Sequence, residues 1–259
     1  MSENHALTRV AFDRNARGVG VGCRIGGVRY DRHFYPPELG QRCSFTPTRP
    51  LAALKRTAQT GHPPHASGPV QPSDLVDVHT IDPTIHLDIR YARRDNFLGM
   101  SVYTSARAFL QRPVAQALLA AHRALRADGY GLVIFDAYRP WFVTRLFWDA
   151  TPAGLKHYVA YPAQGSNHNR GVAVDVTLYD LHTGNQVEMG SAYDEFSPRA
   201  FTNYPGSTSL VRTRRQLLRT CLCAAGFTSY QREWWHFDAR HPGHYPILNM
   251  PFERLATRD

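Results

Sequence analysis

The feature that most constrains this chain is a short β-branched run that contains a single carboxylate. Residues Val172 to Leu178 read V-A-V-D-V-T-L, a composition typical of a strand. Because strand side chains alternate between two faces, Asp175 points away from the face that carries Val174 and Val176. A lone carboxylate in an apolar strand is costly to bury unless a positive group pairs with it. A metal ion would satisfy it, and so the run predicts a sheet with a polar site built into it.

Other segments alternate between helical and strand patterns. Stripes of apolar residues predict helices over 113–128 and 210–225. The apolar run 131–135 predicts a buried strand, and a helix over 141–149 is expected to follow it. Residues 227–238 are interpreted as a strand pair or one bent strand. Because helices and strands are mixed without a regular βαβ alternation, the sequence predicts an α+β protein.

The first 73 residues differ in composition from the rest of the chain. They carry ten Lys and Arg against four Asp and Glu, a net charge of +6, whereas residues 74–259 carry a net charge of +3. They are rich in Arg, Gly and Pro and have no sustained helical or strand period, which favours a disordered extension over 1–73 and one domain over 74–259. The folded part lacks the basic face with aromatic residues that a nucleic-acid-binding domain needs, so no nucleic-acid partner is predicted.

The overall composition is that of a globular protein. Hydrophobic residues make up 43% of the 259 residues and charged residues 20%. No apolar run approaches the roughly 18 residues that a transmembrane helix needs. The N-terminus lacks a basic start followed by an apolar stretch, and so the sequence as written predicts a cytoplasmic protein. The four cysteines form no disulfide framework, and the sequence leaves the oligomeric state open.

Two histidines complete a candidate metal site with the strand carboxylate. His168 lies seven residues before Asp175, and Gly171 between them lets the chain turn back toward the same point. His236 ends the later segment E-W-W-H, which begins at Glu233. Catalytic zinc takes three protein ligands of the His and carboxylate type and leaves one position for water. His168, Asp175 and His236 therefore predict a site for one zinc ion per chain.

Glu233 is the candidate base of a hydrolytic reaction. In a regular strand, Glu233 would point to the face opposite His236, so we expect a bulge or an entering loop at Glu233. From such a bend, a glutamate can take the proton of a water that zinc has made acidic. Structural interpretations stay open at this point: His168 as a hydrogen-bonded core residue, Asp175 as an acceptor for arginine, and Glu233 as a surface residue.

Longer motifs carry a resemblance to a known family. The segment 166–175 reads S-N-H-N-R-G-V-A-V-D, and together with E-W-W-H at 233–236 it resembles the VanX-type D-alanyl-D-alanine dipeptidases, a branch of the zinc D,D-peptidases. The resemblance continues in order through D-I-R-Y-A and D-N-F-L-G within 88–99, D-A-Y-R-P at 136–140, and T-G to M-G-S-A-Y-D within 183–194. It covers the chain from about Asp74 to Glu253.

The resemblance implies a single α+β zinc-peptidase domain whose central, mainly antiparallel sheet is flanked by helices. It also implies hydrolysis of the dipeptide D-alanyl-D-alanine, in cell-wall peptide metabolism or glycopeptide resistance. By position, His168, Asp175 and His236 would hold zinc. Glu233 would be the base, and Arg139 would stabilise the transition state. The arginine suits that role because its permanent charge can donate two hydrogen bonds to a developing oxyanion.

Three further positions match contacts to the dipeptide, namely Tyr91, Ser166 and Asp194, with Asp194 a candidate for the substrate ammonium group. Two features depart from the family pattern. Residues 1–73 have no counterpart, and Phe237 stands where close relatives have tyrosine, which removes a hydroxyl next to a ligand but no ligand.

Two alternative functions remain open from the sequence. A D,D-carboxypeptidase or L,D-endopeptidase of the same clan would act on longer peptidoglycan peptides. A dipeptidase must close the site beyond the amino end of its substrate, and Asp194 with the stretch between Asp175 and Leu210 could form that wall. A remote alternative is a nucleic-acid binder that uses residues 1–73.

Overall fold

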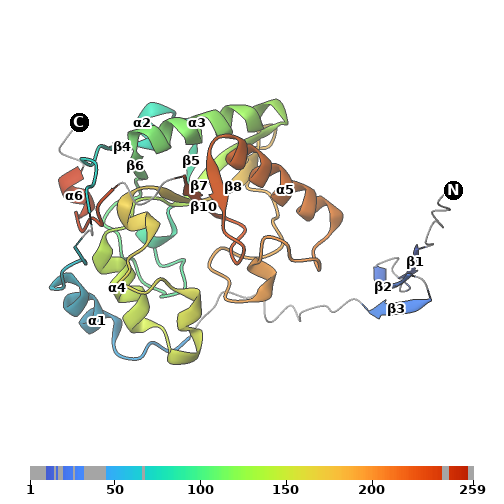
Figure 1. Ribbon diagram of the computed structural model, residues 1–259, viewed down its shortest axis with the longest axis horizontal. Coiled ribbons are helices and arrows are strands. Elements are labelled where there is room, and N and C mark those ends of the chain that lie inside the picture. The colour runs from blue at the N-terminus through green and yellow to red at the C-terminus, as the bar shows by residue number, and fades with distance from the viewer. Residues whose placement is uncertain are drawn as a thin grey trace. The chain divides into compact units, whose positions relative to one another are not determined.

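The strand predicted around Asp175 is β8 (Ala173–Asp180), the middle strand of a five-stranded sheet in the computed structural model of the protein (Figure 1). The strand order is β5-β7-β8-β10-β9. β5 runs parallel to β7, and the other pairings in this sheet are antiparallel. The α+β class and the mainly antiparallel sheet are therefore confirmed. The remaining strands of the sheet are β5 (His86–Leu87), β7 (Tyr130–Asp136), β9 (Phe227–Ser229) and β10 (His236–Ala239).

Helices cover the sheet on both sides. α3 (Arg112–Ala127) contacts β7, and α5 (Ser209–Ala224) contacts β8 and β9. In the view of Figure 1, α3 lies above the sheet, whereas α4 (Trp141–Ala150) and α1 (Leu51–Gln59) lie below it. The predicted helices and strands thus form within one or two residues of their expected ends. The described residues also form shorter elements: β4 (Leu75–Asp77), α2 (Val78–Ile81), β6 (Phe109–Gln111), α6 (Phe252–Leu255) and 3₁₀ turns at Arg90–Ala92, Ala153–Tyr158, Asn167–Arg170 and Pro198–Ala200.

The core explains why β8 can carry a carboxylate. Val174, Val176 and Leu178 are fully buried, as alternation predicts for the apolar face of the strand. On α5, the buried residues Val211, Leu218 and Leu222 recur at helical spacing, and Thr208 caps the helix by accepting a hydrogen bond from the Val211 amide. Asp175 lies on the opposite face of β8, where helix α4 borders a cavity.

The structure describes residues 10–14, 16, 20–25, 27–31, 45–65, 68–240 and 245–255. The chain divides into two units at Gly40 and Gln41. In the first unit, β1 (Val10–Arg14), β2 (Gly20–Ile25) and β3 (Val28–Asp31) pair antiparallel in sequence order. Among the described residues, no helix is long and apolar enough to cross a membrane.

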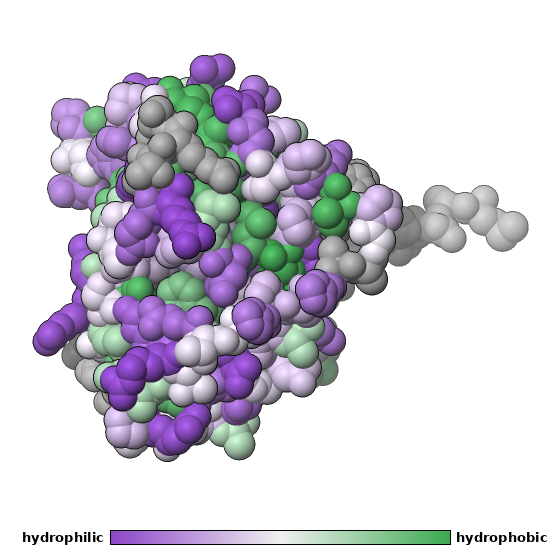
Figure 2. All heavy atoms as spheres, turned by 90° about the vertical axis from the view of Figure 1, so that its left-hand side faces the viewer, coloured by the Kyte–Doolittle hydropathy of each residue, from purple (hydrophilic) through white to green (hydrophobic). Residues whose placement is uncertain are grey.

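The described part of the range 1–73, which the sequence predicts to be a disordered extension, contains regular elements. The three strands of the first unit lie in that range, and α1 belongs to the larger unit, where it packs against α4. Leu54 and Ala58 of α1 are fully buried, because four-residue spacing places both on one face of the helix. Its outer residues join a surface that Figure 2 shows as mainly hydrophilic with separate hydrophobic spots. Residues 1–9, 15, 17–19, 26, 32–44, 66 and 67 of the predicted extension lie outside the described residues.

Candidate active site

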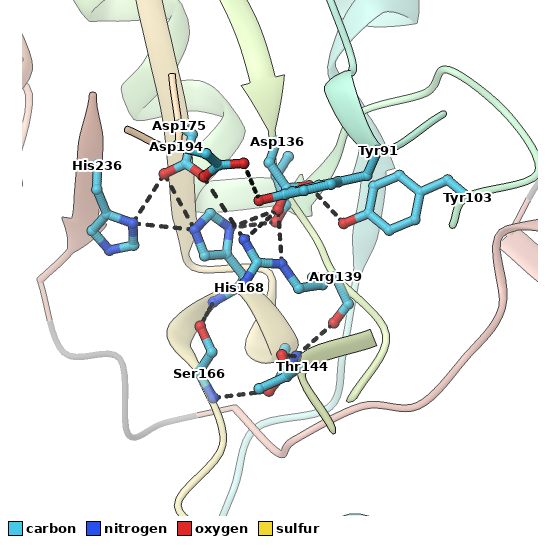
Figure 3. A network of polar contacts seen from close by, with 12 residues as sticks. Tyr91, Tyr103, Asp136, Arg139, Thr144, Ser166, His168, Asp175, Asp194 and His236 are labelled. Atoms are coloured by element: carbon cyan, nitrogen blue, oxygen red, sulfur yellow. Dashed lines mark hydrogen bonds and ion pairs between the residues drawn. The ribbon is translucent and has the colours of Figure 1, made fainter. Parts of the chain in front are cut away.

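Strand pairing brings two of the predicted ligands together. β8 and β10 pair antiparallel with His236 directly opposite Asp175, although 61 residues separate them in the sequence. His168 comes from the 3₁₀ turn Asn167–Arg170, which precedes β8. Gly171 ends this turn with a φ of 68°, a left-handed conformation that favours glycine. The turn points His168 back toward Asp175, as expected from the sequence (Figure 3).

The three side chains converge on one point. Asp175 Oδ1 lies 3.0 Å from His236 Nδ1 and 3.3 Å from His168 Nε2, and the two ring nitrogens are 3.1 Å apart. These ligand atoms all lie within 4.8 Å of one another. His168 and Asp175 are buried, and His236 is partly buried. Burial opposes ionisation of Asp175, but the two histidines hold the pKa of its carboxyl far below the usual range.

The outer hydrogen bonds of the histidines show that a cation fits this point. His168 Nδ1 lies 2.7 Å from the carbonyl oxygen of Ala137, and His236 Nε2 lies 3.0 Å from Asp238 Oδ1. A neutral imidazole has one N–H, and donating it to these oxygens leaves the other nitrogen as a lone pair. In these tautomers two nitrogen lone pairs and a carboxylate oxygen face each other, an arrangement that a cation would satisfy. This N₂O donor set matches the three-ligand sites of catalytic zinc.

Glu233 occupies the bend that strand parity requires. It lies in the turn between β9 and β10, and its carbonyl oxygen accepts a hydrogen bond of 3.3 Å from the His236 amide. The bend brings Glu233 Oε2 to 3.9 Å from His236 Nδ1. Burial raises the pKa of Glu233 to about 7, and a cation at the adjacent ligands would favour its ionised form. The expectation of a loop at this position is confirmed.

Arg139 lies beside the ligands and forms a buried ion pair. Its Nε and Nη2 donate to Asp136 Oδ2 at 2.9 and 2.6 Å, and its Nη2 lies 3.9 Å from Asp175 Oδ2. The guanidinium packs over the rings of Phe147 and Tyr91, with distances of 4.9 and 5.4 Å to the ring centroids. The pairing with Asp136 therefore holds Arg139 within the site, because Asp136 is the last residue of β7 and faces Asp175 across the sheet.

The predicted substrate contacts occupy different places in this network. Asp194 is the non-glycine residue with a left-handed φ, 57°, among the described residues, and it accepts a 2.8 Å hydrogen bond from the Tyr91 hydroxyl (Figure 3). Burial raises the pKa of the Asp194 carboxyl well above its usual value. Ser166 caps the turn that carries His168, because its hydroxyl accepts from the His168 amide. Ser166 therefore also has a structural task.

All eight predicted residues border one cavity of about 310 Å³, which suits a small ligand. The cavity wall also includes aromatic side chains from the segment after the helix α4 and from the loop that carries Asp194, namely Tyr158 and Phe196, whose rings stack at 4.8 Å. Phe237, which stands where close relatives have tyrosine, is buried in β10. The missing hydroxyl is not one of the three candidate ligand atoms.

Sequence reasoning missed the groups that orient the ligands. Tyr193 donates a 2.8 Å hydrogen bond to Asp175 Oδ2, and Asp238 Oδ1 accepts the hydrogen bond from His236 Nε2. Asp238 could have been found, because two-residue spacing places it on the same face of a strand as His236. The Ala137 carbonyl carries no signal in the side-chain sequence, and Tyr193 approaches Asp175 only through the fold.

Comparison with known proteins agrees with this geometry. The sequence profile described as D-ala-D-ala dipeptidase matches residues 71–254. The chain belongs to this family. Curated D-alanyl-D-alanine dipeptidases of Escherichia coli K12 and Enterococcus faecalis V583 are 36% and 35% identical to it over 180 and 182 residues. These alignments cover 70% and 62% of the chain and 92% and 90% of the relatives. A third, from Streptomyces coelicolor, is 31% identical over 189 residues, with 66% and 94% covered.

Membership of this family makes the chain a zinc peptidase, and the three converging side chains could hold the metal ion. The matched region begins at residue 71, so α1 and the first unit lie outside it.

Proposed function

We propose that this protein is a zinc-dependent dipeptidase that hydrolyses D-alanyl-D-alanine. The observation that carries the proposal is the convergence of His168 Nε2, Asp175 Oδ1 and His236 Nδ1 beside Glu233 and Arg139 in one small cavity. Such an arrangement supports hydrolysis of a peptide bond. The substrate, D-alanyl-D-alanine, is inferred from the names of the relatives. Bound zinc supplies an acidified water and polarises the substrate carbonyl.

Glu233 acts as the general base in this proposal. Its carboxylate borders the cavity next to the ligands, so it can accept a proton from the attacking water. The same carboxyl then donates that proton to the leaving nitrogen, which would otherwise depart as a poor anionic leaving group. Its partly buried position keeps the carboxylate close to the reacting atoms.

Arg139 stabilises the negative charge that develops on the carbonyl oxygen. Two of its nitrogens bind Asp136, which fixes the plane of the guanidinium before substrate arrives. Arg139 borders the cavity, and its Nη2 also lies 3.9 Å from Asp175 Oδ2. Because this pairing is present without substrate, little reorganisation is needed during the reaction.

Asp194 recognises the substrate ammonium group, and this preference selects a free dipeptide. A partly buried carboxylate with one tyrosine donor has capacity for a further, positively charged partner. Phe196 and Tyr158 border the cavity and close it to longer peptides. A peptide extended at its amino end would place a neutral amide beside Asp194 in place of the ammonium group. Its extra residue would contact the rings of Phe196 and Tyr158.

The test is hydrolysis by the purified, zinc-loaded protein. We expect cleavage of free D-alanyl-D-alanine and little cleavage of the same dipeptide carrying an N-acetyl group or an extra residue. Glu233→Gln should lower kcat by about 10²- to 10⁴-fold while the protein retains its zinc, because removal of a general base costs rate and not a ligand. Glu253→Gln, at an exposed position of α6 outside the cavity, is the matched control and should keep full activity.

Cleavage of the extended peptide in preference to the dipeptide would replace the proposal by a carboxypeptidase or endopeptidase function. Full activity of Glu233→Gln would reject the role of Glu233.

A further inference from the structure

Tyr193 contacts the metal ligand Asp175, and we propose that it is a positioning residue for that ligand. Its hydroxyl holds one carboxylate oxygen so that the other oxygen alone faces the cation. The inference rests on the zinc site of the proposed function. It assigns a role to a residue that directly precedes Asp194 in the sequence and donates a hydrogen bond to Asp175.

The two oxygens of Asp175 have different partners. Oδ1 faces the nitrogens of His168 and His236, at 3.3 and 3.0 Å. Oδ2 accepts the 2.8 Å hydrogen bond from Tyr193, and its next positive neighbour, Arg139 Nη2, lies beyond hydrogen-bonding distance at 3.9 Å. The Tyr193 hydroxyl is therefore the hydrogen-bond donor that separates the role of one oxygen from the role of the other.

Packing fixes the position of this hydroxyl. Tyr193 is 8% exposed, and its ring lies 4.7 Å from that of Phe135 and 5.4 Å from that of Trp235. Phe135 lies in β7 and Trp235 directly precedes β10, so both rings are held in or directly beside strands that flank β8. A ring held in this way cannot follow a carboxylate that rotates.

The hydroxyl, and not the ring, carries the proposed role. Phenylalanine would fill the same space, but Asp175 Oδ2 would then be a buried acceptor without a short hydrogen bond. Without this hydrogen bond the carboxylate can rotate about its terminal bond, and the oxygen that binds the metal loses its fixed orientation. Partners of metal-bound carboxylates orient the ligand and tune its affinity in this manner.

The Tyr193 hydroxyl also lies beside the tyrosine that holds the substrate-binding candidate Asp194. The hydroxyl oxygens of Tyr193 and Tyr91 are 3.3 Å apart, and Tyr91 donates to Asp194 at 2.8 Å. Asp175 and Asp194 thus each accept a hydrogen bond from one of two adjacent buried tyrosines. Because Tyr193 contacts Asp175 directly, loss of its hydroxyl should affect zinc affinity, whereas loss of the Tyr91 hydroxyl should affect mainly the Asp194 side.

The test measures the zinc dissociation constant of the full chain by competition with a chromophoric chelator. Tyr193→Phe should bind zinc about 10- to 100-fold more weakly than the unchanged protein. Tyr103→Phe is a matched control, because the Tyr103 hydroxyl donates at 2.7 Å to a buried aspartate, Asp136, that is not a ligand. Tyr103→Phe and Tyr91→Phe should keep their zinc affinity within about threefold of the unchanged protein, well short of the loss expected for a ligand partner.

A second readout separates orientation of the ligand from a general effect on folding. The visible spectrum of the cobalt-substituted protein reports the geometry around the ion, and it should change in Tyr193→Phe but not in Tyr103→Phe. Should Tyr193→Phe be too unstable to purify, Tyr193→Met also removes the hydroxyl and keeps apolar volume, and the same loss of affinity is expected.

Unchanged zinc affinity and an unchanged cobalt spectrum in Tyr193→Phe would overturn the inference. An equal loss in Tyr103→Phe would also overturn it, because the effect would then belong to any buried tyrosine hydroxyl. These outcomes differ from failure of the proposed function, in which the unchanged protein binds zinc and does not hydrolyse D-alanyl-D-alanine.

Discussion

Removing Asp136 should destabilise the protein more than removing its partner, Arg139. Asp136 is fully buried and accepts three hydrogen bonds, two from Arg139 and one of 2.7 Å from the Tyr103 hydroxyl. In Asp136→Leu the buried guanidinium keeps its charge, because arginine cannot lose its proton under ordinary conditions. Its nearest remaining carboxylate oxygen, in Asp175, is 3.9 Å away.

Breaking a buried ion pair in this way costs about 3–5 kcal/mol of the free energy of unfolding. For the larger unit, which spans Gln41–Asp259, that cost corresponds to a decrease in Tm of roughly 6–20 °C. Arg139→Met should cost less, since the Asp136 carboxyl that remains can take up a proton. Burial already raises the pKa of Asp136, against the opposing effect of Arg139.

The assay is a double-mutant cycle measured by urea unfolding of the metal-free protein, so that zinc binding does not contribute to the free energy. In Asp136→Leu/Arg139→Met both charges are gone, and the double variant should be more stable than Asp136→Leu by about 2 kcal/mol or more. Peptidase activity should be lost in the double variant, because Arg139 is absent. A double variant whose loss equals the sum of the two single losses would refute the reasoning.

Three further predictions address local structure, pH and the boundary between the units. Gly171→Ala should destabilise the protein and weaken zinc binding, because its φ is left-handed and the new Cβ would lie 2.4 Å from Leu75 Cδ2; thermal unfolding and chelator competition measure both effects. His122 is buried, with Nδ1 accepting from the Leu132 amide, and burial lowers the pKa of its imidazole. The unfolded chain therefore binds a proton below about pH 6.5 that the folded chain does not, so stability should fall as pH decreases, by up to about 1.4 kcal/mol per pH unit, with a smaller slope in His122→Gln. Deletion of residues 1–73 should lower the Tm of the larger unit below that of the protein that lacks residues 1–40, since Leu54 alone contributes about 1.5–3 kcal/mol by burial on α1. Equal Tm values for the two deletions would contradict the packing described above.

The sequence was sufficient for the elements that depend on local patterns. Periodicity located α3, α5, β7 and β8 within one or two residues, because the apolar face of each element repeats at its own period. Parity along the strand also required a bend at Glu233, since Glu233 and His236 could not otherwise share a face. The pattern of α1 was also present, in the spacing of Leu54 and Ala58, but the Arg-, Gly- and Pro-rich surroundings concealed it.

The tertiary structure decided which of these residues meet. Residue type and spacing nominated His168, Asp175 and His236, but only the pairing of β10 with β8 places Asp175 opposite a histidine 61 residues away. The orienting groups have the same origin: Tyr193 reaches Asp175 from a distant loop, and the Ala137 carbonyl belongs to the backbone. A sequence period determines the face on which a side chain lies, whereas its partner across the sheet is set by long-range register and packing, which no local pattern encodes.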